Sequence, residues 1–382
     1  MSAMPDYRVW AEVDLDALAN NLRWIRFGIG EERRIITVVK ADAYGHGLPQ
    51  IAGHLMQHGT DILGVANLGE AAAVRSIGKG WPILMLGACY SSGEFKQLCL
   101  DGVAATISSE SEASELARIA QKLDHQASVH LKIDTGMGRL GVSPEGALSL
   151  ARFINGHASL ALDGVYTHLS SSEDDEVLTR IQLDRFEGFL GELTQNRLSV
   201  SHVHAMNSGG LAYEERWVGN FVRPGLLVYG IVPPGRRRGR VEWLKRLRPV
   251  LSLKSKVAFV KKVSTGSPIS YGQKDVCSRT SVLATVCAGY GDGILRSGGR
   301  RMEVMISGKR CPVRGMITMD QMIVDVSEVP NVRRGDEVVI IGTQGGGGIS
   351  AEDQAGAAGT IPWEVLTSIT QRVPRIYRGV SV

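Results

Sequence analysis

The first part of the chain, from residue 14 to about residue 230, alternates short apolar or β-branched runs with longer amphipathic stretches. The longer stretches, such as 110–122 and 179–193, place apolar residues three and four positions apart, which is typical of helices with one buried face. Eight strand–helix alternations predict a (β/α)8 barrel, although a doubly wound open sheet would alternate in the same way. The predicted strands are Ile35–Val39, Ile62–Val65, Ile83–Leu86, Val103–Ile107, Val129–Ile133, Leu162–Thr167, His202–Ala205 and Leu226–Tyr229.

After Pro249 the pattern changes to β-rich runs separated by Gly, Pro and Asp turns. Four glycines at 345–348 indicate a flexible loop, and a last helical pattern covers 363–371. We therefore predict an α/β protein: a TIM-type barrel over residues 12–240, followed by a mostly β C-terminal domain over 241–382 that also takes in the N-terminal strand 1–11. The β-rich runs are Val250–Val263, Ser281–Cys287, Met302–Ile306 and Glu337–Ile341.

Composition and charge match an ordinary globular protein. Apolar residues make up 43% and charged residues 21%, which excludes a disordered, collagen-like or coiled-coil chain. The net charge is only +4, and the stretch 236–248 alone carries a net charge of +6, so the rest of the chain is near −2. We interpret this stretch as a solvated connector and expect no nucleic-acid partner. Its basic residues are Arg236, Arg237, Arg238, Arg240, Lys245, Arg246 and Arg248.

The five cysteines are odd in number and contain no CxxC pair, so they fit neither a disulfide framework nor a zinc site. This pattern indicates a reducing cytoplasm. The first 14 residues carry acids and lack the apolar core of a signal peptide. No run of 18 apolar residues occurs, so we expect no membrane span. We also expect no bound metal.

In a (β/α)8 barrel the chemistry lies at the carboxyl ends of the strands. Charged and hydroxyl groups gather at these positions, which predicts a site for a polar, anionic ligand. Lys40 directly follows a buried strand, where desolvation lowers a lysine pKa as a Schiff-base lysine requires. A rim lysine that simply reaches water is the plainer alternative. The positions are Lys40, Lys132 to Arg139, His168, His204 to Ser208, and Arg223 to Gly225.

The segment around Lys40, VVKADAYGHG, resembles the pyridoxal-phosphate attachment motif of alanine racemases. Further blocks resemble the same family in its order and at nearly its spacings, along nearly the whole chain. The resemblance implies pyridoxal 5'-phosphate as cofactor, a barrel followed by a β-rich domain, and interconversion of L- and D-alanine that supplies cell-wall peptidoglycan. The blocks are LKIDTGMGRLG (131–141), THLS (167–170), HAMNSGG (204–210), VRPG (222–225), ISYG (269–272), GYGDG (289–293), MITMDQ (316–321) and IPWEV…RVPR (361–375).

The resemblance assigns the two bases that racemisation needs on opposite faces of a planar carbanion. Lys40 would form the Schiff base with the cofactor and act as one acid/base, and Tyr271 resembles the second. A tyrosine with an ordinary pKa of about 10 is a poor base at neutral pH. His168 resembles the residue that supplies part of the required assistance. An ordinary strand aromatic is the simpler alternative for Tyr271.

Other residues resemble the family's cofactor contacts. Arg223 would face the pyridine nitrogen, which then stays unprotonated and makes the cofactor a weaker electron sink. His204 would link Arg223 to the rest of the site, although a hydrogen-bonded core histidine is nearly as good an interpretation. The phosphate cup would consist of Tyr44, Ser208, Gly225 and Leu226.

The substrate side follows the same resemblance. Arg139 would hold the substrate carboxylate in a bidentate pair. Lys132 matches a lysine that is carbamylated in many relatives, and a plain Lys132–Asp pair is the alternative. Met319 and Asp320 would approach the substrate. The resemblance further implies a head-to-tail homodimer with two shared active sites, because Tyr271, Tyr290, Met319 and Asp320 would come from the partner subunit.

Two positions depart from the family pattern. Gln371 replaces a tyrosine that contacts the cofactor phosphate and narrows the pocket, and Met316 replaces an arginine at the channel entrance. We therefore expect serine, or another slightly larger amino acid, to be accepted better than usual, and long-range attraction of the substrate carboxylate to be weaker. Two other functions stay open: a fold-related decarboxylase acting on ornithine or diaminopimelate, and a catalytically silent cofactor-binding protein.

Overall fold

The computed structural model describes residues 7–235 and 241–379. The chain divides into two compact units, one made of 17–43 with 47–248 and the other of 1–16, 44–46 and 249–382. Of the predicted connector, Arg236, Arg237, Arg238 and Arg240 lie outside the described residues. None of the described helices combines the length and the apolar character that crossing a bilayer requires.

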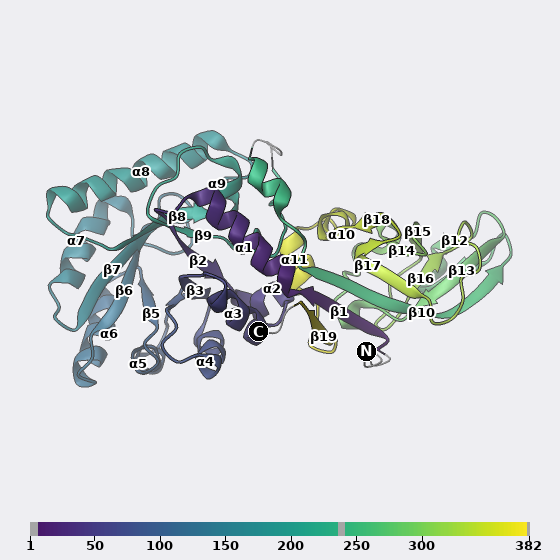
Figure 1. Cartoon of the computed structure of the whole chain (residues 1–382), viewed down its shortest axis with the longest axis horizontal. Coiled ribbons are helices and arrows are strands. Elements are labelled where there is room, and N and C mark those ends of the chain that lie inside the picture. Colours follow the sequence, from purple (N-terminus) through teal and green to yellow (C-terminus); the bar gives the residue numbers. More distant parts are fainter. Residues whose placement is uncertain (1–6, 236–240, 380–382) are drawn as a thin grey trace. The chain divides into compact units, whose positions relative to one another are not determined.

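The first unit contains a closed parallel barrel (Figure 1). Its last strand pairs with its first, with Arg34 opposite Phe221 and Ile35 opposite Val222. This closure confirms the predicted (β/α)8 barrel and excludes the doubly wound open sheet. Within the described residues the barrel strands are, in order, β2 (Arg34–Val38), β3 (Ile62–Val65), β4 (Ile83–Met85), β5 (Ala104–Ile107), β6 (Ala127–Lys132), β7 (Leu160–Tyr166), β8 (His202–Asn207) and β9 (Phe221–Arg223).

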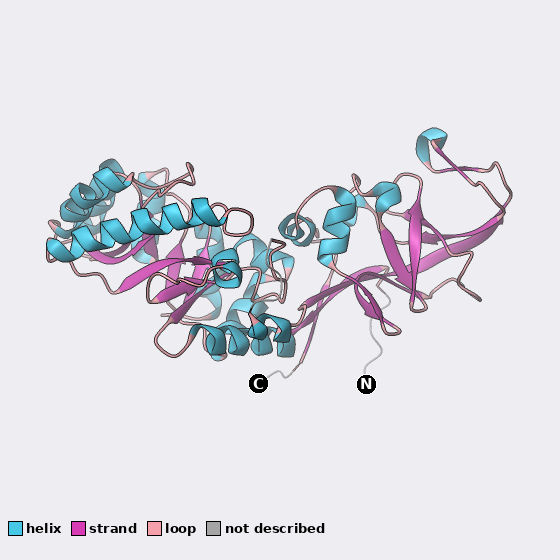
Figure 2. Ribbon diagram, turned by 90° about the horizontal axis from the view of Figure 1, so that it is seen from above, coloured by secondary structure: helices cyan, strands magenta, loops and turns pink. Residues whose placement is uncertain are grey.

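Helices surround this barrel (Figure 2), and their termini carry the expected polar caps. The predicted helix 110–122 is α6, whose Ser109 and Glu112 form a capping box. At the start of two other helices, the side chains of Asn67 and Ser91 each accept one backbone N–H, from Glu70 and Glu94. The helices of the barrel are α1 (Leu15–Ile29), α3 (Leu48–Gln57), α4 (Leu68–Ile77), α5 (Ser92–Leu100), α6 (Glu110–Lys122), α7 (Pro144–Asn155), α8 (Glu176–Gln195) and α9 (Ser208–Tyr213).

The eighth barrel strand was predicted in the wrong place. Leu226–Tyr229 is not a strand but a helical turn, with hydrogen bonds from Val228 N to Gly225 O and from Tyr229 N to Leu226 O. The strand is instead the short segment β9, which ends directly before Pro224. Because proline has no N–H to donate to a ladder, the strand stops there, and the following apolar residues are buried in the turn.

The second unit is a mostly antiparallel sheet, as predicted from the β-rich runs. Its first strand comes from the N-terminus and pairs with both β10 and β19. In the described residues the sheet order is β18 (Gly347–Ile349), β17 (Glu337–Gln344), β14 (Glu303–Ile306), β15 (Lys309–Arg314), β16 (Met322–Asp325), β13 (Ser281–Val286), β10 (Leu251–Val263), β1 (Val9–Asp14) and β19 (Arg375–Arg378).

Three further details of this unit differ from the prediction or extend it. The glycine run 345–348 is not a flexible loop but the tight hairpin between β17 and β18, in which Gly345 and Gly346 adopt positive φ. The last helix, α11 (Pro362–Thr367), is shorter than the 363–371 pattern, and α10 (Ala351–Ala358) was not foreseen. A small hairpin of β11 (Pro268–Ile269) and β12 (Asp275–Val276) stands beside the main sheet.

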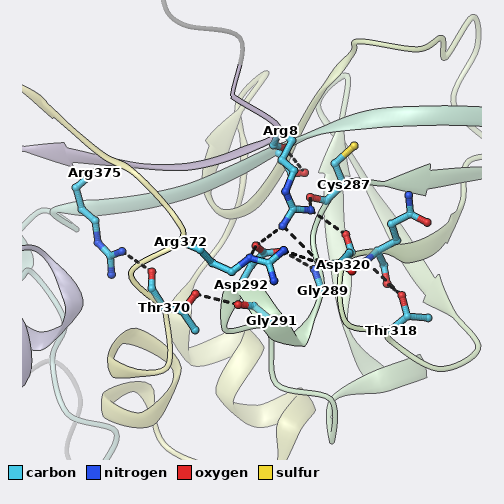
Figure 3. A network of polar contacts seen from close by, with 12 residues as sticks. Arg8, Cys287, Gly289, Gly291, Asp292, Thr318, Asp320, Thr370, Arg372 and Arg375 are labelled. Carbon is cyan, nitrogen blue, oxygen red and sulfur yellow. Dashed lines mark hydrogen bonds and ion pairs between the residues drawn. The ribbon is translucent and has the colours of Figure 1, made fainter.

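Four charged side chains of this unit form one cluster (Figure 3). The Asp292 carboxylate is fully buried, accepts from Arg8 Nη2 at 2.5 Å and pairs with Arg372 Nε at 3.1 Å. Arg372 Nη2 also binds Asp320 Oδ1 at 2.6 Å. Because Arg8 directly precedes β1 and Arg372 shortly precedes β19, the cluster ties both ends of the chain to the loops that carry Asp292 and Asp320.

We expect Asp292→Ala to lower the free energy of unfolding by about 2–3 kcal/mol, because it leaves the two guanidinium groups and the Gly289 N–H without their shared acceptor. The control is Glu328→Ala, which removes the carboxylate from an exposed pair with Arg279 and should cost less than about 0.5 kcal/mol. Urea unfolding followed by circular dichroism measures both. Equal losses for the two variants would contradict the account.

Candidate active site

The carboxyl ends of the barrel strands carry the predicted rim residues. Lys132 is the last residue of β6 and Arg223 is the last of β9, while His168 follows β7 by two positions. Lys40 follows β2, and its charge interacts with that of Arg139. The charges of Arg139 and Arg223 also act on His168, so the structure brings these side chains to one rim.

Arg223 is a buried cation, only 3% exposed, whose protein partners are all neutral. Its Nη1 donates to His204 Nδ1 and to the His204 carbonyl, both at 2.8 Å. Its Nη2 donates to the carbonyls of Thr167 and Ala205 at 2.6 and 3.0 Å. Burial lowers the Arg223 pKa to about 10, which still leaves it charged at neutral pH. Its Nε–H has no partner among the described residues, so one donor is free for a ligand.

Lys132 and Arg223 lie over the same aromatic ring. Lys132 Nζ is 5.3 Å and the Arg223 guanidinium 5.2 Å from the centre of the Tyr166 ring. Burial, together with the neighbouring charges of Arg223 and Arg139, lowers the Lys132 pKa to about 8. A Lys132–Asp134 ion pair is not formed within the described residues. The Asp134 carboxylate instead accepts backbone N–H groups of its own loop, including that of Met137 at 2.8 Å.

Lys40 begins a turn with unusual backbone geometry. Ala41, Asp42, Ala43 and Tyr44 in α2 (Lys40–Gly45) all have positive φ, between 52° and 54°, so the turn is left-handed. Each such non-glycine residue costs about 1–2 kcal/mol. Side chains hold the turn: Glu70 Oε1 accepts the Ala41 N–H at 2.8 Å, and Asp42 Oδ1 accepts the Leu48 N–H at 2.7 Å.

Burial and charge both act on the Lys40 amine. Desolvation and the positive charge of Arg139 lower its pKa, while the nearby Glu70 carboxylate partly opposes this. The result favours a larger fraction of neutral, nucleophilic amine than an exposed lysine would have. Sequence reasoning missed Glu70, which lies in α4, the helix that follows β3.

His168 is held neutral. Burial, and then the charges of Arg223, Lys132, Arg139 and Lys40, keep its pKa well below the usual value for histidine. Its backbone carbonyl accepts from Gln182 Nε2 at 3.2 Å, and the same buried amide accepts the Ser170 N–H at 2.9 Å. Gln182 therefore fixes the segment that carries His168. In this state His168 can offer a hydrogen bond to a catalytic group but no positive charge.

Two of the predicted phosphate-cup positions meet directly. Ser208 Oγ accepts the Gly225 N–H at 2.9 Å, which joins the loop after β8 to the turn after β9. Leu226 lies in that same turn. Tyr44 is buried and belongs to the second unit, whereas Ser208, Gly225 and Leu226 belong to the first. Gln371 also belongs to the second unit, where it is exposed.

The other predicted residues of the second unit are strongly exposed. Tyr271 sits at the tip of the β11–β12 hairpin with 74% of its surface exposed, and Met319 is 52% and Tyr290 41% exposed. Gly291 N binds Met319 O at 2.8 Å, so the loops carrying Tyr290 and Met319 are joined, and Asp320 is held by Arg372.

Met316 does not lie in a neutral environment. It lines an open hollow of about 420 Å³ together with Arg296, Arg300 and Arg301. These guanidinium groups supply the positive charge that position 316 itself lacks.

The barrel rim fits a doubly anionic ligand with a reactive carbonyl. Lys40, Lys132, Arg139 and Arg223 are cations at this rim, and among the described residues none of them forms an ion pair with a carboxylate. A buried cation without a counter-charge is costly, so the arrangement favours a ligand that brings negative charge.

Two residues of this region were missed at the level of sequence. Tyr166 lies between Lys132 and Arg223, and His130 is hydrogen-bonded to His204 at 2.8 Å. Each lies two positions before a residue that was predicted: Tyr166 before His168, and His130 before Lys132. The period-two rule for strands therefore contained the signal that would have found them.

Comparison with known proteins gives one consistent family. Residues 13–233 match the family profile "Alanine racemase, N-terminal domain" and residues 250–377 match "Alanine racemase, C-terminal domain". Alanine racemase from Symbiobacterium thermophilum is 40% identical over 372 residues, covering 97% of both chains, and that of Halothermothrix orenii is 38% identical over 371 residues with the same coverage.

Solved structures agree with these matches. Alanine racemase from a D-cycloserine-producing Streptomyces lavendulae superposes with a TM-score of 0.91 at 32% identity, covering 99% of this chain and 98% of that one. The Bacillus anthracis enzyme with bound L-Ala-P superposes with a TM-score of 0.88 at 35% identity, covering 98% and 96%. The racemase resemblance is thereby favoured over the fold-related decarboxylase. The chain belongs to the alanine racemase family.

Proposed function

We propose that this chain, an amino-acid racemase by its family, interconverts L- and D-alanine with pyridoxal 5'-phosphate as cofactor. One observation carries the proposal most strongly. The buried Arg223 guanidinium, bound only by neutral acceptors, shares a barrel rim with a lysine whose pKa is lowered. This combination suits a cofactor that combines a covalent anchor with a ring-nitrogen acceptor. D-alanine for cell-wall peptidoglycan, made in the cytoplasm, is the role we infer.

The barrel residues would hold the cofactor at three points. Lys40 would bind its aldehyde carbon, Arg223 Nε–H would donate to its ring nitrogen, and the corner of Ser208 and Gly225 would receive its phosphate, with Leu226, Tyr44 and Gln371 completing the contacts. When bound, the cofactor supplies delocalisation of the negative charge left at the substrate α-carbon. Because a protonated Arg223 could only donate to the ring nitrogen, it would limit that delocalisation and favour proton return over other reactions.

The proton moves would be divided between two side chains. Lys40 Nζ would exchange the α-proton on one face, and the Tyr271 hydroxyl would do so on the other. Neutral His168 would supply a hydrogen bond in support of Tyr271. Arg139, which is exposed and makes no ion pair within the described residues, would pair with the substrate carboxylate, while Met319, Asp320 and Tyr290 would bound the substrate.

We further propose a head-to-tail homodimer. Tyr271, Tyr290 and Met319 are too exposed to work as they stand, because an exposed tyrosine hydroxyl lacks the excluded-water surroundings that acid–base catalysis needs. A second copy of the chain would cover them and bring each hairpin to the other copy's barrel.

Mixing two inactive variants tests the two bases and the sharing of sites together. Lys40→Ala and Tyr271→Phe should each lose at least about a hundredfold in kcat. After the two are mixed, unfolded and refolded, about a quarter of the wild-type activity should return, because half of the dimers are hybrids and each hybrid has one intact site. Co-refolding each variant with itself is the control. No recovery in the mixture would exclude sites shared in this way.

Lys132 would carry a carbamate that fixes Arg139. A neutral amine is needed to add carbon dioxide, and the Lys132 pKa of about 8 leaves a useful neutral fraction near neutral pH. With carbon-13-labelled bicarbonate we expect a carbamate signal that grows from pH 7 to pH 9, as the fraction of neutral amine rises. The signal should be absent in Lys132→Ala. If no signal appears at any pH, Lys132 acts as a free amine.

A second candidate function is racemisation of serine alongside alanine. Gln371 is exposed and forms no hydrogen bond within the described residues, so it leaves space that a tyrosine ring would fill. We expect Gln371→Tyr to lower the ratio of serine to alanine kcat/KM by about tenfold. The control is Glu328→Ala, which removes an exposed carboxylate paired with Arg279 and should leave the ratio of serine to alanine kcat/KM unchanged. A wild-type serine kcat/KM more than about a thousandfold below that for alanine would contradict this function.

A further inference from the structure

A chain of hydrogen-bonded nitrogen atoms runs from the Arg223 guanidinium through the imidazole rings of His204 and His130. His204 Nδ1 faces Arg223 Nη1 at 2.8 Å, and His204 Nε2 faces His130 Nδ1 at 2.8 Å. Both histidines are buried. Their ring faces are packed as well: Tyr166 stacks on His204 with centroids 4.6 Å apart, and His202 stacks on His130 at 5.3 Å.

The positions of the protons in this chain follow from its first member. A guanidinium can only donate, so His204 Nδ1 is an acceptor and carries no proton. A neutral His204 then carries its proton on Nε2, which must donate to His130 Nδ1. His130 in turn carries its proton on Nε2. Burial lowers the pKa of His130 to about 3 and keeps that of His204 well below its usual value, so neither ring is charged near neutral pH.

A glycine makes room for this arrangement. A Cβ at position 164 would lie 2.6 Å from His130 Nδ1 and 2.8 Å from His130 Cγ, closer than real Cβ contacts occur. Gly164 does not have a positive φ, so its backbone would accept other residues. The space it leaves is therefore used by the His130 ring, in the position where that ring accepts from His204.

We propose that His130, seated against Gly164, is a positioning residue that fixes the His204 ring and through it the Arg223 guanidinium. His130 supplies the only acceptor that His204 Nε2–H has among the described residues. Without it a buried N–H is left unpaired, which is costly enough to rotate the ring or admit water. Either change removes one of the two acceptors of Arg223 Nη1. The proposal rests on the proposed function in one respect: that function gives Arg223 a part in the reaction.

The first test needs no activity. In the apoprotein labelled with nitrogen-15 at histidine, two-bond proton–nitrogen correlations report which ring nitrogen is protonated. We expect His204 and His130 both to be neutral with the proton on Nε2, with the His130 signals identified by their loss in His130→Asn. A protonated Nδ1 or a cationic ring at His204 would overturn the proposal. A protein that is inactive but shows the expected tautomers would count against the proposed function alone.

The second test compares variants of the holoenzyme. His130→Leu keeps the bulk but removes the acceptor, and we expect kcat to fall about tenfold or more with KM for alanine nearly unchanged. Gly164→Ala, which displaces the ring, should act in the same direction. His130→Asn, whose Oδ1 can replace Nδ1 as acceptor, should keep most of the activity. The matched control is His202→Leu, which removes a ring stacked on His130 that shares no hydrogen bond with it.

Thermal unfolding accompanies each kinetic measurement. A fall in kcat at an unchanged melting temperature, restored in His130→Asn, supports positioning rather than general stability. Wild-type kcat in a folded His130→Leu would overturn the proposal. If that variant does not fold, Gly164→Ala and the wild-type tautomer spectrum decide between the same two outcomes.

Discussion

The buried guanidinium of Arg223 is the constraint around which the barrel rim is organised. A cation that is removed from water and has no carboxylate partner needs other acceptors, and strands β7, β8 and the loops after them supply only neutral ones. The positive charge is therefore not cancelled inside the protein. It remains available to a ligand, together with the charges of Lys132, Arg139 and Lys40. The polar network beneath the rim satisfies both Nη groups of Arg223 and leaves its Nε–H free.

That network explains why the barrel interior contains buried polar side chains and a glycine. Histidines at positions 130 and 204 replace the apolar side chains that usually fill a barrel, and Gly164 leaves space where a larger residue would pack. The left-handed turn after Lys40 is a second local cost, held by Glu70 and Asp42. This strain and this buried polarity lie at the end of the barrel where the chemistry is proposed. The second unit presents exposed loops tied together by the Asp292 cluster.

Much of this arrangement could be predicted from the sequence. The features that could not be predicted were missed for physical reasons. Lys40 and His168 could be placed because each closely follows an apolar strand, and strand ends meet at one rim. Leu226–Tyr229 was misassigned because a buried helical turn and a buried strand share the same apolar pattern. The strand period could have placed His130 beside Lys132, but its role depends on partners in two other strands, which no local pattern names. The pairing of Arg8 with Asp292 joins residues 284 positions apart, which no local pattern reveals.

Reduction of the purified holoenzyme with borohydride, followed by peptide mass mapping, tests the central claim most directly, because it fixes a Schiff-base cofactor to the residue that holds it. The account predicts one modified site per chain, at Lys40 in the turn after β2, and loss of the label in Lys40→Ala. A label on another lysine, or none in cofactor-supplemented protein, would contradict the claim that this barrel rim is built to receive the cofactor.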